Sequence, residues 1–173
     1  MKLKIILSLI IISLSNMAFS QSVEIKDSHY KFKISLPNQW QKTNTEETDK
    51  KDAISYSCKS NDGRLFVMIL AFKLNTIKNL ADLIYTVEKD VSLNIPKRSS
   101  DYSDYDFGQY DGRSAVYKNN ESAETIYYFR TKNENLSDNY AYVLRFICQS
   151  TLYNSSLETE IKNIADTFKY VSE

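Results

Sequence analysis

Three aspartates, Asp101, Asp104 and Asp106, lie close together in a tyrosine-rich segment and form the most distinctive cluster of oxygen ligands in the sequence. Carboxylates at this spacing can gather around Ca²⁺, which prefers oxygen ligands. The calcium-loop pattern of alternating aspartates with a glycine at the sixth position is absent, because the alternation stops at Gly108. The alternative is a solvated connector whose tyrosines cover a sheet edge. The three aspartates are therefore candidate metal ligands.

Catalytic motifs are otherwise sparse. His29 is the only imidazole, and it lies at the start of the first strand-like segment rather than beside a nucleophile. We interpret it as an exposed residue at the start of a strand rather than as a base or a metal ligand. The sequence contains no G-x-S-x-G, S-x-x-K or H-E-x-x-H pattern. With only three glycines, it also lacks a glycine-rich phosphate loop. We therefore predict no catalytic residue and no cofactor, and a protein that is not an enzyme.

The first twenty residues have the three parts of a secretory signal peptide. Lys2 and Lys4 give a charged start, an apolar run follows from Ile5 to Leu14, and small residues precede an expected cleavage between Ser20 and Gln21. The apolar run is about half the ~20 residues that a bilayer-spanning helix needs. No cysteine lies near the cleavage site, which argues against a lipoprotein. We expect a secreted or periplasmic protein with no membrane span after cleavage.

Export changes the interpretation of the two cysteines, Cys58 and Cys148. Each lies in a strand-like run at the parity of its apolar neighbours, so both are expected to face a core. In an oxidising compartment they could form a disulfide, which would contribute about 4–5 kcal/mol by closing a loop of roughly 90 residues. The alternative is a pair of buried thiols that act as small apolar side chains.

Charge and composition exclude further classes. The chain has 22 basic and 22 acidic side chains, and loss of Lys2 and Lys4 leaves the mature chain mildly acidic. Such a balance gives no electrostatic reason to bind nucleic acid or an anionic membrane. With 42% hydrophobic residues among 173, the chain can bury a core of its own.

Strand patterns occur in two groups along the mature chain. Residues 29–36 alternate, with Tyr30, Phe32, Ile34 and Leu36 on one face, and Trp40 follows as a core anchor. Residues 52–60 and 65–72 predict a hairpin around Asp62-Gly63, whose second arm is apolar enough for a central strand. Residues 113–118, 124–130 and 140–149 predict a meander. The polar residues 43–52 and 97–110 are expected to be connections.

Two amphipathic helices complete the pattern. The first has an apolar stripe of Ile77, Leu80, Ile84, Val87 and Val91, with a cap at Asn75 or Thr76. The second follows a capping box formed by Ser155 and Glu158; its stripe comprises Leu157, Ile161, Ile164, Ala165 and Phe168. We therefore predict one α+β domain over residues 21–173. Its fold is expected to be an α/β/α sandwich, with a roughly six-stranded, mostly antiparallel sheet and one helix on each face.

Three segments resemble the PsbP-like and DcrB-type family. They are residues 30–40, which read YKFKISLPNQW, the step at 110–115, and residues 161–169, which end in Thr-Phe-Lys. The resemblance spans about residues 24–171 and implies the sandwich shared by these proteins, whose members are mostly non-catalytic binding or assembly factors. Gln39 replaces the glycine often found before the tryptophan, and the metal positions of some PsbP proteins have no match here.

From the resemblance we expect an exported, non-enzymatic binding or assembly module of the cell envelope. Its partner would be a protein held at the sheet edge or by the connector at 97–112, although an analogy of fold does not identify that partner. The alternative is a periplasmic protein that binds a small ligand or a metal ion. The sequence leaves the oligomeric state open.

Overall fold

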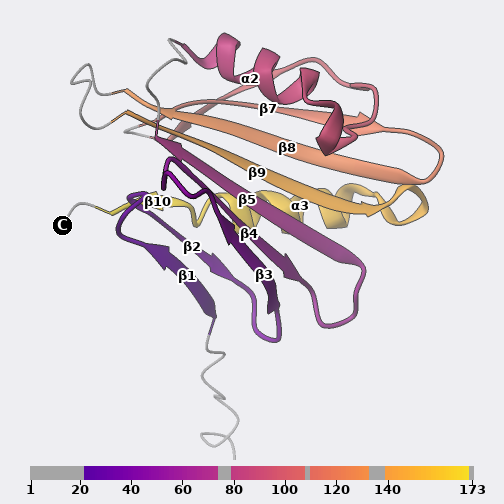
Figure 1. Cartoon of the computed structure of the whole chain (residues 1–173). Helices are drawn as coiled ribbons and strands as arrows, with labels where there is room; N and C mark the ends of the chain where they lie inside the picture. Colours follow the sequence, from indigo (N-terminus) through magenta and orange to yellow (C-terminus); the bar gives the residue numbers. More distant parts are fainter. Residues whose placement is uncertain (1–21, 74–78, 108–109, 133–138, 172–173) are drawn as a thin grey trace, which may run out of the picture.

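The computed structural model describes residues 22–73, 79–107, 110–132 and 139–171 (Figure 1). In these ranges the chain forms ten strands and two α-helices: β1 Val23–Asp27, β2 Phe32–Leu36, β3 Gln41–Glu47, β4 Ala53–Lys59, β5 Leu65–Lys73, α2 Leu80–Lys89, β6 Ser103–Phe107, β7 Tyr110–Lys118, β8 Ser122–Thr131, β9 Tyr140–Gln149, α3 Ser155–Ala165 and β10 Lys169–Tyr170. Short 3₁₀ turns follow α2 and β9, at Val91–Leu93 and Ser150–Leu152.

Seven strands form the main sheet, in the order β3-β4-β5-β9-β8-β7-β6. All of its pairings are antiparallel. The β4–β5 hairpin turns at Gly63, whose φ of 70° is a conformation that glycine adopts without strain. The long crossover that contains α2 takes the chain from β5 to β6 at the far edge, so β5 and β9, distant in sequence, become neighbours at the centre.

One face of the main sheet is covered by α2 (Figure 1). Asn79 caps this helix by accepting a hydrogen bond from the Asp82 amide. Leu83, Ile84 and Val87 are its buried residues. They pack on sheet residues that alternate along β7, β8 and β9, namely Ala115, Tyr117, Ile126, Tyr128, Ala141 and Val143. This cluster fixes α2 above β7, β8 and β9.

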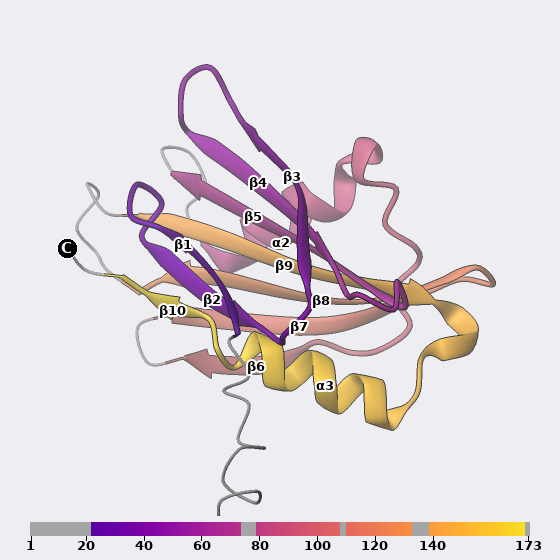
Figure 2. The ribbon, with the colours of Figure 1, turned by 90° about the horizontal axis from the view of Figure 1, so that it is seen from below.

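The opposite face carries both α3 and a second sheet, β1-β2-β10 (Figure 2). Phe168, between α3 and β10, stacks at 5.6 Å from Phe32 of β2 and at 5.3 Å from Phe129 of β8. Because one aromatic ring contacts both sheets, the larger core is a single body of aromatic side chains. Trp40 is buried in it as predicted.

Polar contacts also hold the second sheet to the first. The Tyr56 hydroxyl donates to Asp27 Oδ2 at 2.7 Å, and the Tyr30 hydroxyl donates to Glu47 at 3.1 Å. The buried Tyr142 hydroxyl donates to the Tyr30 carbonyl at 2.8 Å. Each bond joins one sheet to the other, so these tyrosines specify how the sheets dock as well as filling the core.

The predicted fold class is wrong. We expected an α/β/α sandwich with about six strands and one helix on each face, but the described chain is mostly β, and α3 shares its face with a three-stranded sheet. Four strands were not predicted. β3 has seven exposed residues and therefore shows no apolar alternation. β6 lies within the expected polar connector, and β1 and β10 have only five and two residues.

Most of the other elements are confirmed. The buried face of β2 comprises Phe32, Ile34 and Leu36, and the hairpin and meander strands form where predicted. The helix ends differ from expectation: α2 is capped by Asn79 rather than Asn75 or Thr76, and α3 by Asn154 rather than Ser155. Val91, predicted to continue the apolar stripe of the first helix, is 93% exposed. Ile77 lies outside the described residues.

Candidate functional site

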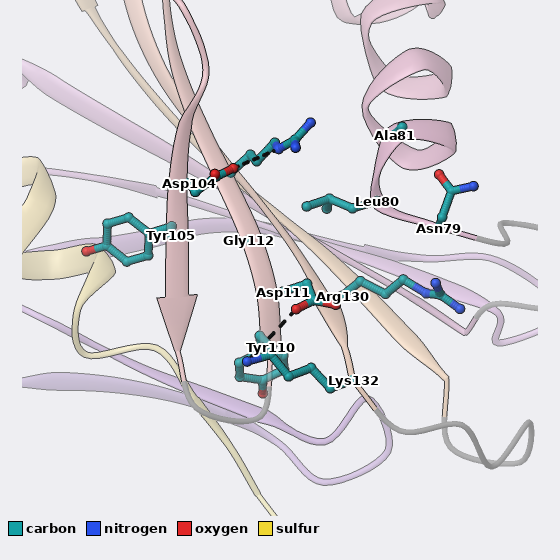
Figure 3. A pocket seen from close by; sticks show the side chains of 11 residues that line it. Asn79, Leu80, Ala81, Asp104, Tyr105, Tyr110, Asp111, Gly112, Arg130 and Lys132 are labelled. Carbon is teal, nitrogen blue, oxygen red and sulfur yellow. Dashed lines mark hydrogen bonds and ion pairs between the residues drawn. The ribbon is translucent and has the colours of Figure 1, made fainter.

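A cleft of about 590 Å³ lies between the first turn of α2 and the strands β6, β7 and β8 (Figure 3). We call it the α2 cleft. It is lined by Asn79, Leu80, Ala81, Asp104, Tyr105, Tyr110, Asp111, Gly112, Arg113, Arg130 and Lys132. Its volume is in the range of small-molecule sites, which are concave and combine apolar walls with a few polar groups. Its size and its basic side chains make it a candidate binding site.

Strand alternation places the charged side chains of this cleft. Arg113 shares a strand face with Ala115 and Tyr117, which pack beneath α2, and Arg130 shares one with Tyr128. Apolar residues thus cover the middle of this face, and the basic residues lie on it near the start of β7 and the end of β8. The cleft begins where the apolar contact with α2 stops.

Gly112 allows the strands of the cleft floor to approach closely. A Cβ at this position would lie 2.6 Å from the Tyr105 carbonyl oxygen and 2.8 Å from Phe129 Cδ1. No real Cβ tolerates such contacts, and the carbonyl belongs to the backbone of the neighbouring strand β6. The sequence therefore requires glycine here to seat β6 against β7.

Two of the three basic side chains of the cleft are paired. Arg113 Nε donates to Asp104 Oδ1 at 3.0 Å, and Lys132 Nζ lies 3.9 Å from Asp111 Oδ1. The carboxylates are exposed, with 87% of the Asp104 side chain and 65% of that of Asp111 accessible. These pairs are therefore screened by water and can exchange partners with a ligand at little cost.

Arg130 differs from its two neighbours. Among the residues that the structure describes, none is a hydrogen-bond partner of its buried Nε, although the side chain as a whole is only partly buried. Asp111 is its direct cross-strand partner in the β7–β8 register, yet the Asp111 carboxylate is paired with Lys132. In Figure 3 the Arg130 side chain runs from the sheet toward the start of α2.

A tyrosine–glutamate network holds α2 in place beside the cleft. Glu88 of α2 accepts hydrogen bonds from the hydroxyls of Tyr117 at 2.5 Å and Tyr102 at 2.6 Å. Tyr117 is in turn 2.9 Å from the Tyr128 hydroxyl. Burial, followed by the hydrogen bond to Glu88, raises the pKa of Tyr117 well above its ordinary value. The wall of the cleft is therefore a fixed element.

The predicted metal ligands are not brought together as a set. Asp104 faces the cleft in an ion pair with Arg113, and Asp101 precedes β6 as an exposed residue. Asp106 belongs to β6, but its side chain lies outside what the structure describes. In the part of the chain that is described, no three histidine, cysteine, aspartate or glutamate side chains are grouped closely enough to hold a metal ion.

The predicted cysteine pair is held as two free thiols. Cys58 is in β4 and Cys148 in β9, with β5 between them. Two strand spacings of about 4.8 Å separate their backbones by nearly 10 Å, beyond the ~7 Å that a disulfide can span. Burial raises the pKa of the Cys58 thiol to about 11 and also raises that of Cys148. The alternative of two buried, unreactive thiols is therefore the correct one.

His29 is exposed, as predicted, and lies in the turn before β2. Its Nε2 is 2.6 Å from Lys73 Nζ and 3.3 Å from the Lys51 carbonyl oxygen. The imidazole thus links the β1–β2 turn to the end of β5. No hydroxyl or thiol nucleophile is among its hydrogen-bond partners in the described ranges.

The expected cleavage residues Ser20 and Gln21 lie outside the described residues. No helix in the described ranges is long and apolar enough to span a bilayer.

The basic residues of the α2 cleft were missed at the sequence level. A signal for them existed: Arg113 and Arg130 interrupt apolar strand patterns at the parity that faces the first helix. Recognising it would have required knowing that β7 and β8 are adjacent and that α2 covers only part of that face. The sequence matches no family model and no curated protein.

Proposed function

We propose that the protein is an exported, non-enzymatic binding module of the cell envelope, and that the α2 cleft is its ligand site. The observation that carries this proposal is a cleft of about 590 Å³ lined by Arg130, a partly exposed cation that makes no ion pair with the described residues. A guanidinium without a carboxylate partner can bind an acceptor that a ligand supplies. The expected α/β/α sandwich lends the proposal no support, because the structure has a different fold.

The cleft supports binding more directly than chemistry. Asp104 and Asp111 are exposed carboxylates committed to ion pairs, and neither has a nucleophile beside it. Both cysteine thiols are buried in the opposite core, away from the cleft. The groups that do converge on the cleft are hydrogen-bond donors and an apolar wall, which hold and orient a ligand.

A matched pair of substitutions on α2 tests the proposal. Ala81 is exposed and lines the cleft, so Ala81→Trp fills it without disturbing the core. Tyr85, on the same helix and 66% exposed, does not line the cleft, and Tyr85→Trp serves as control. A fragment library screened by protein NMR should give binders that Ala81→Trp abolishes and Tyr85→Trp preserves. Binders that are indifferent to Ala81→Trp, or no binders at all, contradict the proposal.

Export is tested separately. We expect the protein recovered from a cell-envelope fraction to begin at Gln21, as read by intact mass. A chain that retains residues 1–20 in the cytoplasm contradicts an exported role. The predicted protein partner also stays a prediction, which stoichiometric co-purification from the same fraction would support. Recovery of the protein alone counts against it.

A further inference from the structure

We infer that the α2 cleft recognises an organic monocarboxylate, with the carboxylate on Arg130 and an apolar body against Leu80 and Ala81. The inference deepens the proposed function and rests on the cleft being a ligand site. It follows from three features of the cleft: the state of Arg130, the formal charge of the lining residues, and the shape of the wall.

Arg130 supplies the donor. A guanidinium presents a planar fork of N–H groups that matches a carboxylate, and Nε forms one edge of that fork. In this protein the Arg130 side chain is only partly buried and runs from the sheet toward α2 (Figure 3). A carboxylate that enters the cleft meets the accessible part of a guanidinium that makes no ion pair with the described residues.

The charge of the cleft sets the charge of the ligand. Among the described lining residues, Arg113, Arg130 and Lys132 are offset by Asp104 and Asp111, which leaves one formal positive charge. A monocarboxylate neutralises this charge. A phosphate monoester carries about −1.5 to −2 at neutral pH and would leave uncompensated negative charge beside two aspartates. The floor of the cleft therefore favours a carboxylate over a phosphate.

The wall of the cleft sets the rest of the ligand. Leu80 and Ala81 open α2, and the Leu80 side chain points from the helix toward the sheet (Figure 3). The helix N-terminus adds a favourable field for an anion within the first turn. An anion with a short apolar tail can therefore place its carboxylate on Arg130 and its tail on Leu80. A small inorganic anion would leave this wall unused.

Hexanoate is a suitable probe, with hexanamide as its neutral counterpart and inorganic phosphate as the competing anion. We expect hexanoate to bind the purified protein, hexanamide not to bind measurably, and phosphate to bind more weakly than hexanoate. Arg130→Gln should weaken hexanoate binding about tenfold or more, since it removes a charge-assisted pair. Arg130→Lys should retain part of the affinity. Arg64→Gln removes a charge from the β4–β5 turn and should change nothing.

Each result bears on the inference. Melting curves confirm that the variants are folded before binding is compared. Equal hexanoate affinity in wild-type protein and Arg130→Gln overturns the inference, as does equal binding of hexanamide. If hexanamide or neutral fragments bind and Ala81→Trp abolishes that binding, the cleft is still a ligand site and only the carboxylate assignment fails. If nothing enters the cleft, the proposed function fails with it.

The carboxylate could belong to a free acid or to the C-terminus of a peptide. N-acetyl-leucyl-alanine and its C-terminal amide separate these sources. Dipeptide acid binding that exceeds hexanoate binding about tenfold, and that is lost in the amide, identifies a chain terminus. Dipeptide acid binding equal to or weaker than hexanoate binding identifies a free acid. In both cases Arg130→Gln must reduce binding.

Discussion

The buried ion pair between Arg145 of β9 and Glu124 of β8 offers the sharpest stability prediction. Arg145 Nε donates to Glu124 Oε2 at 2.6 Å, and Nη2 donates to Oε1 at 2.8 Å. The two side chains are 8% and 3% exposed, so neither charge is hydrated. Glu124→Gln leaves the guanidinium buried with neutral acceptors in place of a carboxylate. Arg145→Met leaves the carboxylate buried with no cation.

The size of the effect follows from this geometry. Each of the two bonds involves ionised partners and is worth about 1.5–3 kcal/mol. Loss of one partner from a buried pair costs about 3–5 kcal/mol, much of it from the charge left behind. We therefore expect Arg145→Met to lower the free energy of unfolding by about 3–5 kcal/mol. Glu124→Gln, which keeps one acceptor, should lower it by somewhat less.

Urea unfolding followed by circular dichroism measures these changes. The double variant Glu124→Gln with Arg145→Met should lose much less than the sum of the two single losses, because it leaves no unpaired charge. Glu24→Gln is the matched control, since its ion pair with Lys33 is 45% and 40% exposed and should contribute under about 1 kcal/mol. Single losses as small as the control, or strict additivity in the double variant, would refute the reasoning.

Three further predictions concern other parts of the fold. Gly112→Ala should lower the free energy of unfolding by about 1–3 kcal/mol, because its Cβ would collide with the Tyr105 carbonyl; an unchanged urea midpoint would contradict this close approach. Denatured, unreduced protein should release two thiols, Cys58 and Cys148, that react slowly in the native state, whereas no thiol after denaturation would indicate a disulfide. Burial raises the pKa of Tyr117 and other core tyrosines, so the folded state keeps their protons and stability should fall as pH rises above about 10; phenolate formation by these buried tyrosines before unfolding, beyond that of the exposed ones, would contradict it.

The central strands were predictable because their patterns are local. Leu65 to Phe72 is apolar at almost every position, and the meander at 113–149 has clear strand runs between turn residues. These segments form β5, β9, β8 and β7, which are four consecutive strands of the main sheet. Their burial on at least one face imposes the pattern that the sequence shows.

The edges were not predictable from the same signals. β3 is held mainly by hydrogen bonds to β4 and all seven of its residues are exposed, so its sequence QKTNTEE has no apolar alternation that would predict a strand. β10 has two residues, and it joins β2 only because α3 delivers it there. Such elements depend on backbone pairing that becomes available after the core has formed. The second sheet could therefore not be foreseen, and the fold class built without it was wrong.

The candidate site, too, was only partly predictable from the sequence. Asp104 was identified as a charged residue of interest, but its partner Arg113 comes from a neighbouring strand that was expected to follow a loop. Both cysteines lie in a core, as their parity predicted, but the disulfide alternative fails on strand order, because β5 separates their strands. Composition and parity indicate which residues are buried; strand order decides which of them meet.

Chemical-shift mapping with hexanoate tests the α2 cleft most directly. In an amide spectrum of the protein, we expect the largest changes at Leu80, Ala81, Gly112 and Arg113, which line the cleft on both sides. The same titration of Arg130→Gln should leave these signals nearly unmoved. Shifts that cluster elsewhere on the molecule, or that are equally large without the Arg130 guanidinium, would contradict the assignment of this cleft as a carboxylate site.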